Sequence, residues 1–302
     1  MSANKWHWPV APYPWAKQVP SADGAKLVKP TITHARRYLL LPSVTSIVSG
    51  LSKGAKFEDW QLRQSLFKAV LRPFPGSSDA ITHEYDPGEI REWQNDILRE
   101  LADDLEVSAN EGKEVHGGVE DFYRGLPVQL NVAQQNIINA VGPDMEKKGV
   151  TKIVPEETIG GPEVGFVGTP DMVGHDDAGK IKALWDIKTC SASAFAGFKT
   201  ESSLYQNWRL QQGGYCILLG DHHIPKAQIL SDREGEDRSC KIIDYSEGDR
   251  WSLAFRHEMI SWFYRNDYYP WKLWEEDKGG IIERATAAMD VVRRLQFADA
   301  SI

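Results

Sequence analysis

Two stretches near the middle of the chain alternate between apolar and polar or small residues, which is the pattern of β-strands. They cover residues 164–169 and 181–188, and each has a period of two rather than the helical period. The segment between them, residues 175–180, reads HDDAGK and has the composition of a turn. The sequence therefore predicts an antiparallel hairpin.

The second strand of this hairpin carries charged side chains on one face. Successive side chains of a strand point to opposite faces, so Asp186 and Lys188 share a face and Ile187 is buried behind them. A register symmetric about the turn places Asp171 opposite Leu184, on the same face as Asp186 and diagonal to it, about 5.5 to 8 Å away. Two carboxylates this close need a cation or a shared proton between them, and their oxygens suit Mg²⁺ or Mn²⁺. An adjacent lysine suits an anionic substrate.

Helical spacing of apolar residues predicts two separate helices upstream of the hairpin. They cover residues 89–106 and 112–123, and the first crowds its acidic residues on the face opposite its apolar ones. In the second helix, His116 and Glu120 lie one turn apart on one face. The glycine pair at residues 117–118 weakens a helix interior, which indicates close approach by another backbone. This spacing alone leaves open whether His116 is structural or functional.

The N-terminal part of the chain contains three successive segments of different composition. Residues 1–30 interleave aromatic residues with proline, so they cannot form a regular helix. From residue 31 the chain is apolar and β-like, and after Pro42 a helix is expected that reaches about residue 71. Ser43 and Thr45 are candidate caps of that helix, and a capped helix N-terminus is also a ready phosphate site.

The regions on either side of the hairpin have simpler patterns. A first strand is expected at residues 154–158, which include Glu156 and Glu157. After the hairpin, residues 189–200 are small and polar and predict a loop.

A helix and two more strands are expected further along the chain. Residues 205–219 predict a helix that places Gln211 and Tyr215 one turn apart, as site residues or as a buried hydrogen-bonded pair. The glycine pair 213–214 would let this helix pack tightly on the sheet. Residues 227–245 predict two strands around a charged turn.

Nine aromatic residues crowd into residues 251–274. Aromatic side chains of this kind build stacking platforms for single-stranded nucleic acid. Helical spacing of several of them favours a second interpretation, a buried core.

Composition restricts the class of protein. The chain has 302 residues, of which 41% are hydrophobic and 26% charged, as in a globular protein with one core and additions. It has neither an apolar run of about 18 residues nor a signal-peptide pattern, so we expect no membrane partner and a cytoplasmic location. The three cysteines are too few and too scattered for a disulfide framework. Without a phosphate-binding G-x-x-x-x-G-K-[S/T] loop, no ATP is expected.

The net charge of −8 is unusual for a protein that binds a polyanion, so the distribution of charge matters more than its sum. Residues 86–121 contain twelve acidic and three basic residues, which leaves the remainder near neutral. Residues 51–74 contain five basic and two acidic residues. Of these, Lys53, Lys56 and Arg63 are candidate phosphate contacts, unless this is simply a solvated helix face.

Three short motifs occur in the order and spacing of a known family. Residues 170–171 (PD) are followed after fourteen residues by residues 186–188 (DIK), which resembles the signature of PD-(D/E)XK nucleases. Residues 112–120 (GKEVHGGVE) resemble the G-x-x-V-H-x-x-x-E helix that supplies a histidine ligand in RecB-like members. Residues 211–215 (QQGGY) resemble the Q-x-x-x-Y motif of the same family.

A fourth motif extends the resemblance toward the N-terminus. Residues 42–45 (PSVT), followed by Trp60, are similar to the N-terminal segment of phage exonucleases and of the mitochondrial genome-maintenance exonuclease. The resemblance covers roughly residues 41–220.

This resemblance implies a fold and a division of the chain. The expected fold is α/β, with a restriction-endonuclease-like core, a mixed central sheet flanked by helices, and helical additions at both ends. The expected parts are an N-terminal Pro/aromatic arm at 1–40, a nuclease domain at 41–245, and a C-terminal helical extension at 246–302 packed on the nuclease domain.

The resemblance also implies a site. One or two Mg²⁺ or Mn²⁺ ions are expected on His116, Asp171, Asp186 and the main-chain carbonyl of Ile187. Lys188, Gln211 and Tyr215 are expected to act in catalysis together with both aspartates. DNA contact is expected from Ser43, Thr45, Lys53, Lys56, Arg63 and Thr189. Support of the site is expected from Glu120 and from either Glu156 or Glu157.

The function implied is that of a metal-dependent DNA exonuclease acting on single- or double-stranded DNA. The resemblance also implies a phage origin and a role in DNA recombination, repair or degradation in a bacterial or phage-infected cell. The partner it implies is a recombination or single-strand-binding protein. Three cysteines cannot supply the four-cysteine iron-sulfur cluster of some members. Three alternatives stay open: a selective endonuclease, a non-cleaving accessory protein that binds nucleic acid, and an α/β protein in which Asp186 and Lys188 form only a surface ion pair.

Overall fold

A five-stranded mixed sheet lies at the centre of the protein. The computed structural model describes residues 5–49, 68–69, 87–221, 223–246 and 248–299. The strand order is β11-β10-β9-β8-β5, in which β9 and β10 are parallel and the other neighbours are antiparallel. The strands are β5 (Lys152–Pro155), β8 (Met172–His175), β9 (Ile181–Cys190), β10 (Lys226–Asp232) and β11 (Cys240–Asp244). The predicted α/β class with a mixed sheet is therefore confirmed.

The predicted hairpin exists as β8 and β9, but its register and first strand differ from the prediction. Met172 lies opposite Trp185, and the ladder is irregular between Gly174 and His175. Continuing this register by one residue places Asp171 opposite Asp186, rather than opposite Leu184. A slip of two residues keeps every side chain on its face, so the two aspartates still share a face.

The stretch expected as the first hairpin strand belongs to another sheet. Residues 166–168 form β7 (Phe166–Gly168), which pairs antiparallel with β6 (Ile159–Gly161) in a separate two-stranded sheet. Proline lacks the N–H that a continuous ladder needs, and Pro170 separates β7 from β8. The hairpin therefore begins two residues after this proline.

The two helices expected upstream of the hairpin are one helix, α4 (Pro87–Tyr123). Residues 107–111 contain neither glycine nor proline, so nothing local ends the helix there. A Cβ at Gly118 would lie 2.2 Å from Nε2 of Gln134 on α5 (Val132–Lys148). The close neighbour of the glycine pair is thus a side chain, and the expectation of a second backbone was wrong.

The helix expected at residues 205–219 is α7 (Gln206–Leu219), and its glycines contact other helices rather than the sheet. A Cβ at Gly213 would lie 2.2 Å from the main-chain oxygen of Trp251, on α8 (Gly248–Asn266). A Cβ at Gly214 would meet Val44 and Phe255. At Gly213 a side chain would clash with the main chain of α8, so the two helices can approach this closely only because glycine has no Cβ.

The aromatic segment 251–274 is a core, as its helical spacing predicted. Its fully or nearly buried side chains are Trp251, Phe255, Trp262, Phe263, Tyr268 and Trp274. The N-terminal arm joins the same core, because the ring of Trp6 lies 6.0 Å from that of Trp262 and 6.1 Å from that of Tyr268. Helix α9 (Pro270–Asp299) follows, with a break at Asp277.

The β-like character expected from residue 31 was wrong. Residues 32–38 form helix α1 (Ile32–Tyr38), which begins at Thr31 with its N–H donating to Nδ1 of His34 and ends at Leu39 with a positive φ. This local capping outweighs the apolar pattern. Strands β1 (Trp6–His7) and β4 (Leu41–Pro42) pair, as do β2 (Val19–Pro20) and β3 (Leu27–Val28). Helix α2 (Val44–Val48) starts where expected, and the rest of the predicted helix to residue 71 lies almost wholly outside the described residues.

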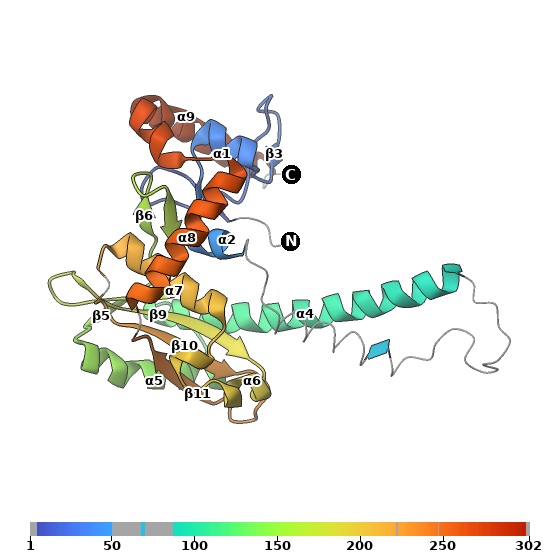
Figure 1. Cartoon of the computed structure of the whole chain (residues 1–302), viewed down its shortest axis with the longest axis vertical. Helices are drawn as coiled ribbons and strands as arrows, with labels where there is room; N and C mark the ends of the chain where they lie inside the picture. The colour runs from blue at the N-terminus through green and yellow to red at the C-terminus, as the bar shows by residue number, and fades with distance from the viewer. Residues whose placement is uncertain (1–4, 50–67, 70–86, 222, 247, 300–302) are drawn as a thin grey trace.

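Helices cover both faces of the sheet (Figure 1). Helix α5 lies on one face, while α7, α8 and the N-terminal segments lie on the other, and α4 reaches from the sheet far out of the body. The loop expected at 189–200 is instead the end of β9, helix α6 (Ala192–Gly197) and a short connection to a 3₁₀ turn, η1 (Glu201–Ser203). No helix in the described part of the chain is long and apolar enough to cross a membrane.

Candidate active site

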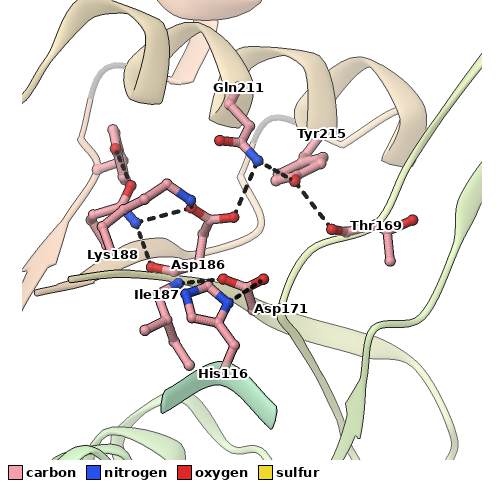
Figure 2. A network of polar contacts seen from close by, with 10 residues as sticks. His116, Thr169, Asp171, Asp186, Ile187, Lys188, Gln211 and Tyr215 are labelled. Atoms are coloured by element: carbon pink, nitrogen blue, oxygen red, sulfur yellow. Dashed lines mark hydrogen bonds and ion pairs between the residues drawn. The ribbon is translucent and has the colours of Figure 1, made fainter. Parts of the chain in front are cut away.

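The candidate site lies on the hairpin, where Asp171 and Asp186 face each other. Asp186 is on β9 and is 1% exposed, while Asp171 directly precedes β8. The main-chain N–H of Ile187 donates to Oδ2 of Asp171 at 2.6 Å. This bond holds the Asp171 carboxylate against the main chain of β9, beside Asp186 (Figure 2).

Three side chains donate to the carboxylate of Asp186. Lys188 Nζ and Gln228 Nε2 reach Oδ2, the latter at 3.0 Å, and Gln211 Nε2 reaches Oδ1 at 3.2 Å. Lys188 and Asp186 lie on one face of β9, and Ile187 is buried on the other, as the strand period predicted. The lysine–aspartate pair is not a surface ion pair, because the Asp186 side chain is almost fully buried.

His116 enters the site from α4. Its Nδ1 lies 3.3 Å from Oδ1 of Asp171, so a residue over fifty positions upstream contacts the hairpin. Burial lowers the pKa of His116, but the charge of Asp171 and the hydrogen bond to it outweigh burial and leave the pKa raised. The helix comes this close to β9 because of Gly112, where a Cβ would lie 3.1 Å from Oγ1 of Thr189.

Helix α7 covers the site from the opposite side (Figure 2). Nε2 of Gln211 donates to Oη of Tyr215 at 2.7 Å as well as to Asp186, and Tyr215 donates to the main-chain oxygen of Thr169 at 3.3 Å. Burial, followed by the charges of both aspartates, raises the pKa of Tyr215 well above its ordinary value. Tyr215 therefore stays a neutral donor, and the predicted pair connects α7 to Asp186 on β9 and to the main chain between β7 and β8.

The pKa values of the two aspartates at the site are shifted in opposite directions. Burial raises the pKa of Asp171, but His116 and Lys188 outweigh it and bring the pKa to about 2. The pKa of Asp186 is raised, because burial, aided by the charge of Asp171, outweighs the Lys188 ammonium. Burial lowers the pKa of Lys188, and the two carboxylates raise it further than burial lowers it. Two buried carboxylates that repel each other are an arrangement that a cation stabilises.

Sequence reasoning missed Gln228 and Tyr245. Gln228 on β10 is fully buried, and its Oε1 accepts from Oη of Tyr245 at 3.0 Å, while its Nε2 donates to Asp186. A signal was present in the sequence, since Gln228 is the one polar residue in the run Ala227–Leu230. A glutamine inside a fully buried strand must have a polar partner.

The glutamates expected to support the site lie in different places. Glu157 contacts Nε2 of His175 at 2.6 Å, at the far end of β8 from Asp171. Burial and then the charge of Glu156 raise the pKa of Glu120, so Glu156 lies near Glu120 on the His116 side. Glu120 itself pairs with Arg124 at 2.5 Å. Glu156 is therefore the one of the two candidates on the side of the site.

The predicted DNA contacts are only partly within the described residues. Ser43 is 5% exposed, and its Oγ accepts from the N–H of Ser46 at 3.1 Å, which makes it the N-cap of α2. Thr45 lies exposed in the first turn of α2, and Thr189 lies on β9 one residue after Lys188. Three further candidates lie outside the described residues: Lys53, Lys56 and Arg63.

The residues at the site fit Mg²⁺ or Mn²⁺ by their chemistry. Two carboxylates and an imidazole are suitable ligands for these ions. In the described part of the chain, however, no group of three or more His, Cys, Asp or Glu side chains is arranged around a common ion position. The Asp171 oxygens are bonded to His116 and Ile187, and Oδ2 of Asp186 to Lys188. Binding of an ion therefore requires some of these contacts to open.

Comparisons with known proteins give a weak likeness. No family model and no curated protein matches the chain. A crystal structure of an alkaline exonuclease (LHK-Exo) from Laribacter hongkongensis is similar over 78% of this chain and 91% of that chain, with 12% identity and a TM-score of 0.37. A structure of LHK-Exo in complex with dAMP covers 54% of this chain and 84% of that chain, with 15% identity and a TM-score of 0.32. A likeness of this size does not establish a shared fold or activity.

Proposed function

We propose that the protein hydrolyses phosphodiester bonds of DNA with the help of Mg²⁺ or Mn²⁺, as an exonuclease of the PD-(D/E)XK type. One observation carries the proposal. Asp171, directly before β8, and Asp186 on β9 lie across the hairpin from each other beside Lys188, and Nδ1 of His116 on the distant helix α4 lies 3.3 Å from Oδ1 of Asp171. These are the residues of two separate motifs, and the fold brings them together.

The side chains have distinct roles in this proposal. Asp171, Asp186, His116 and the carbonyl of Ile187 hold one or two ions. When bound, such an ion activates water and neutralises charge on the phosphate. Lys188 orients the attacking water or stabilises negative charge that develops on the phosphate.

The surrounding groups keep the acidic pair in place. Gln211 fixes Oδ1 of Asp186, and Tyr215 ties α7 to the main chain of Thr169. Both donors are held by neighbouring contacts before substrate arrives, which reduces the reorganisation needed during the reaction. The substrate is single- or double-stranded DNA, and the proposed setting is DNA recombination, repair or degradation.

The experiment that tests this function is a cleavage assay with oligonucleotides labelled at the 5′ or the 3′ end. Single- and double-stranded forms are incubated with Mg²⁺, Mn²⁺ or EDTA, for the wild type, Asp186→Asn and the control Asp290→Asn. Asp290 is an exposed aspartate on α9 that contacts Arg293 instead of the site. We expect stepwise shortening by the wild type and the control only, and only with metal.

Other outcomes of this assay identify the alternatives. Internal cuts without shortening from the ends indicate an endonuclease. Intact DNA under every metal condition, with binding retained, indicates an accessory protein and contradicts the proposed function. Equal cleavage by Asp186→Asn and wild type contradicts the assigned site.

A further inference from the structure

A second polar pocket lies on the α7 side of the sheet. It has a volume of about 440 Å³ and forms where η1, the first turn of α7, the end of β11 and the start of α8 meet. Its lining includes Lys199, Arg209 and Arg250 together with the hydroxyls of Thr200, Ser202 and Ser246. Three cations around hydroxyl donors make a surface that is suited to an anion.

A buried tryptophan orients the central cation of this pocket. Trp251 is 7% exposed, and its Nε1 donates to Oε1 of Glu201 at 2.7 Å, so the indole is fixed. The guanidinium of Arg209 lies over this ring at 4.3 Å from the centroid, and that of Arg250 lies at 5.2 Å. Stacking holds a guanidinium in place without using its N–H donors.

One donor of Arg209 lacks an acceptor within the described part of the chain. Its Nε is buried without a hydrogen-bond partner, and the contact of Arg209 with the Trp251 ring is a stacking contact. Buried donors in folded proteins are almost always satisfied. Arg209 also lines the pocket, so a ligand that brings acceptor oxygens there meets its guanidinium group.

The acidic residues of the pocket are already engaged. Glu201 accepts from the N–H and Oγ of Ser246 at 2.8 and 2.9 Å, besides Trp251. Asp244 contacts Lys148 at 2.7 Å and Lys147 at 3.7 Å. The lining thus carries three cations against two carboxylates, and one of these carboxylates, Asp244, is already paired with lysines outside the pocket.

We propose that this pocket binds a backbone phosphate of the DNA strand on which the protein acts, an inference that rests on the proposed function. A phosphodiester offers the planar pair of oxygens that a guanidinium fork matches. The pocket also adjoins the site through one connection. Tyr245, between Asp244 and Ser246 in the pocket wall, donates to Gln228, which donates to Asp186. A strand held in the pocket thus lies next to the elements that carry the acidic pair.

Equilibrium binding of a fluorescent oligonucleotide without terminal phosphates tests the proposal. It is measured in EDTA, so that no cleavage occurs, at several salt concentrations. We expect Arg209→Gln to weaken binding at least about fivefold and to reduce the slope of log K against log salt by about one. Arg209→Lys, which keeps the charge and loses the fork, should fall between Arg209→Gln and wild type.

The matched control is Arg37→Gln. Arg37 is an exposed arginine whose guanidinium stacks over Tyr38 at 5.3 Å, outside the pocket. Arg37→Gln removes the same charge and the same kind of stacking contact as Arg209→Gln, but outside the pocket. This variant should therefore bind the oligonucleotide as tightly as the wild type does. Thermal melting verifies that each variant folds, and Lys199→Gln, at an exposed position, replaces Arg209→Gln if the latter does not fold.

The outcomes separate this inference from the proposed function. If the wild type cleaves DNA and Arg209→Gln and Lys199→Gln bind it with unchanged affinity and salt slope, the pocket does not contact the strand and the inference is wrong. If inorganic phosphate alone raises the melting temperature of the wild type but not of Arg209→Gln, while oligonucleotide binding is unchanged, the ligand is free phosphate and the DNA assignment is wrong. If the wild type neither binds nor cleaves DNA, the proposed function itself fails.

Discussion

Gln228 on β10 donates from one amide nitrogen to both the main-chain oxygen and the Oδ2 carboxylate oxygen of Asp186 on the neighbouring parallel strand. Its own oxygen accepts from Oη of Tyr245 at 3.0 Å, which determines which end of the amide faces the carboxylate. Burial raises the pKa of Tyr245, so the phenol remains a donor. Asp186 is thus oriented by a chain of two buried residues.

Gln228→Leu, which is similar in volume, removes this orientation. We expect it to lower cleavage about 10- to 100-fold and to weaken Mn²⁺ binding, as loss of an outer partner of a metal ligand does. Calorimetric titration with Mn²⁺ in the absence of DNA measures the second effect directly. Tyr245→Phe, which keeps Gln228 in place, should have a smaller effect of the same sign. Normal Mn²⁺ affinity and cleavage in Gln228→Leu would show that Gln228 is only part of the core.

Lys188→Ala separates catalysis from metal binding. Lys188 Nζ contacts Oδ2 of Asp186, where it competes with an ion for the same oxygen. We therefore expect Lys188→Ala to cleave at less than about a tenth of the wild-type rate, a difference of ~1.4 kcal/mol, while Mn²⁺ binds equally well or more tightly. The control is Lys182→Ala, on the same face of β9 and six residues away. Weaker Mn²⁺ binding in Lys188→Ala alone would contradict the assigned role.

Local sequence patterns were sufficient to predict the strands and helices that carry the site, but not how these elements pair and pack against one another. The period of two placed Asp186 and Lys188 on one face of β9, because that property depends only on the strand itself. The predicted register of β8 was wrong by two residues. The pair next to the turn, His175 with Ile181, is offset by one, and the irregularity between Gly174 and His175 adds the second, which symmetry about the turn does not anticipate.

Contacts between distant segments were the main omission. Trp6 packs on Trp262 and Tyr268, over 250 residues away, and composition alone described the N-terminal segment as an arm. Gln228 was overlooked because its partner lies on a parallel strand more than forty residues away. Such pairs depend on tertiary packing, to which neither period nor propensity is sensitive.

Two helical glycines should respond oppositely to alanine. A Cβ at Gly213 would lie 2.2 Å from the main-chain oxygen of Trp251, whereas a Cβ at Gly117 has nothing within 4 Å. Gly213→Ala forces α7 and α8 apart and should destabilise the protein by about 1 to 3 kcal/mol or more. Gly117→Ala should stabilise it by up to about 1 kcal/mol through helix propensity. Urea unfolding measures both, and equal stability of the two variants would contradict the close crossing of α7 and α8.

His7 should make the protein less stable in mild acid. Burial lowers the pKa of its imidazole and outweighs the hydrogen bond to the main-chain oxygen of Tyr13, which raises it, while the charge of Lys5 adds a smaller lowering. Because the folded pKa is below the unfolded value of about 6.5, the unfolded state binds the proton first. The contribution to stability is complete above pH 6.5 and is lost as the pH falls from there toward the folded pKa.

The variant His7→Asn keeps a donor for Tyr13 but does not titrate. Melting temperatures from pH 8 to pH 5 should therefore fall less steeply for His7→Asn than for the wild type, and the difference should arise below pH 6.5. His34, whose pKa burial also lowers, is present in both proteins and cancels. Parallel curves over the whole range would show that His7 does not determine the acid sensitivity.

His116 is the site residue whose role the geometry tests most sharply, because its imidazole lies against the carboxylate of Asp171. An imidazole is a softer ligand than a carboxylate, so His116 should favour Mn²⁺ over Mg²⁺ relative to a site of oxygen ligands. We expect His116→Ala to lower Mn²⁺ affinity about 10-fold or more, and His116→Asp to recover binding while shifting the preference toward Mg²⁺. Both affinities are measured by titration without DNA. His175→Ala is the control, since His175 contacts Glu157 at the other end of β8. Unchanged Mn²⁺ affinity in His116→Ala would mean that His116 only neutralises Asp171, and the RecB-like assignment of this helix would be wrong even if cleavage by the aspartates remains.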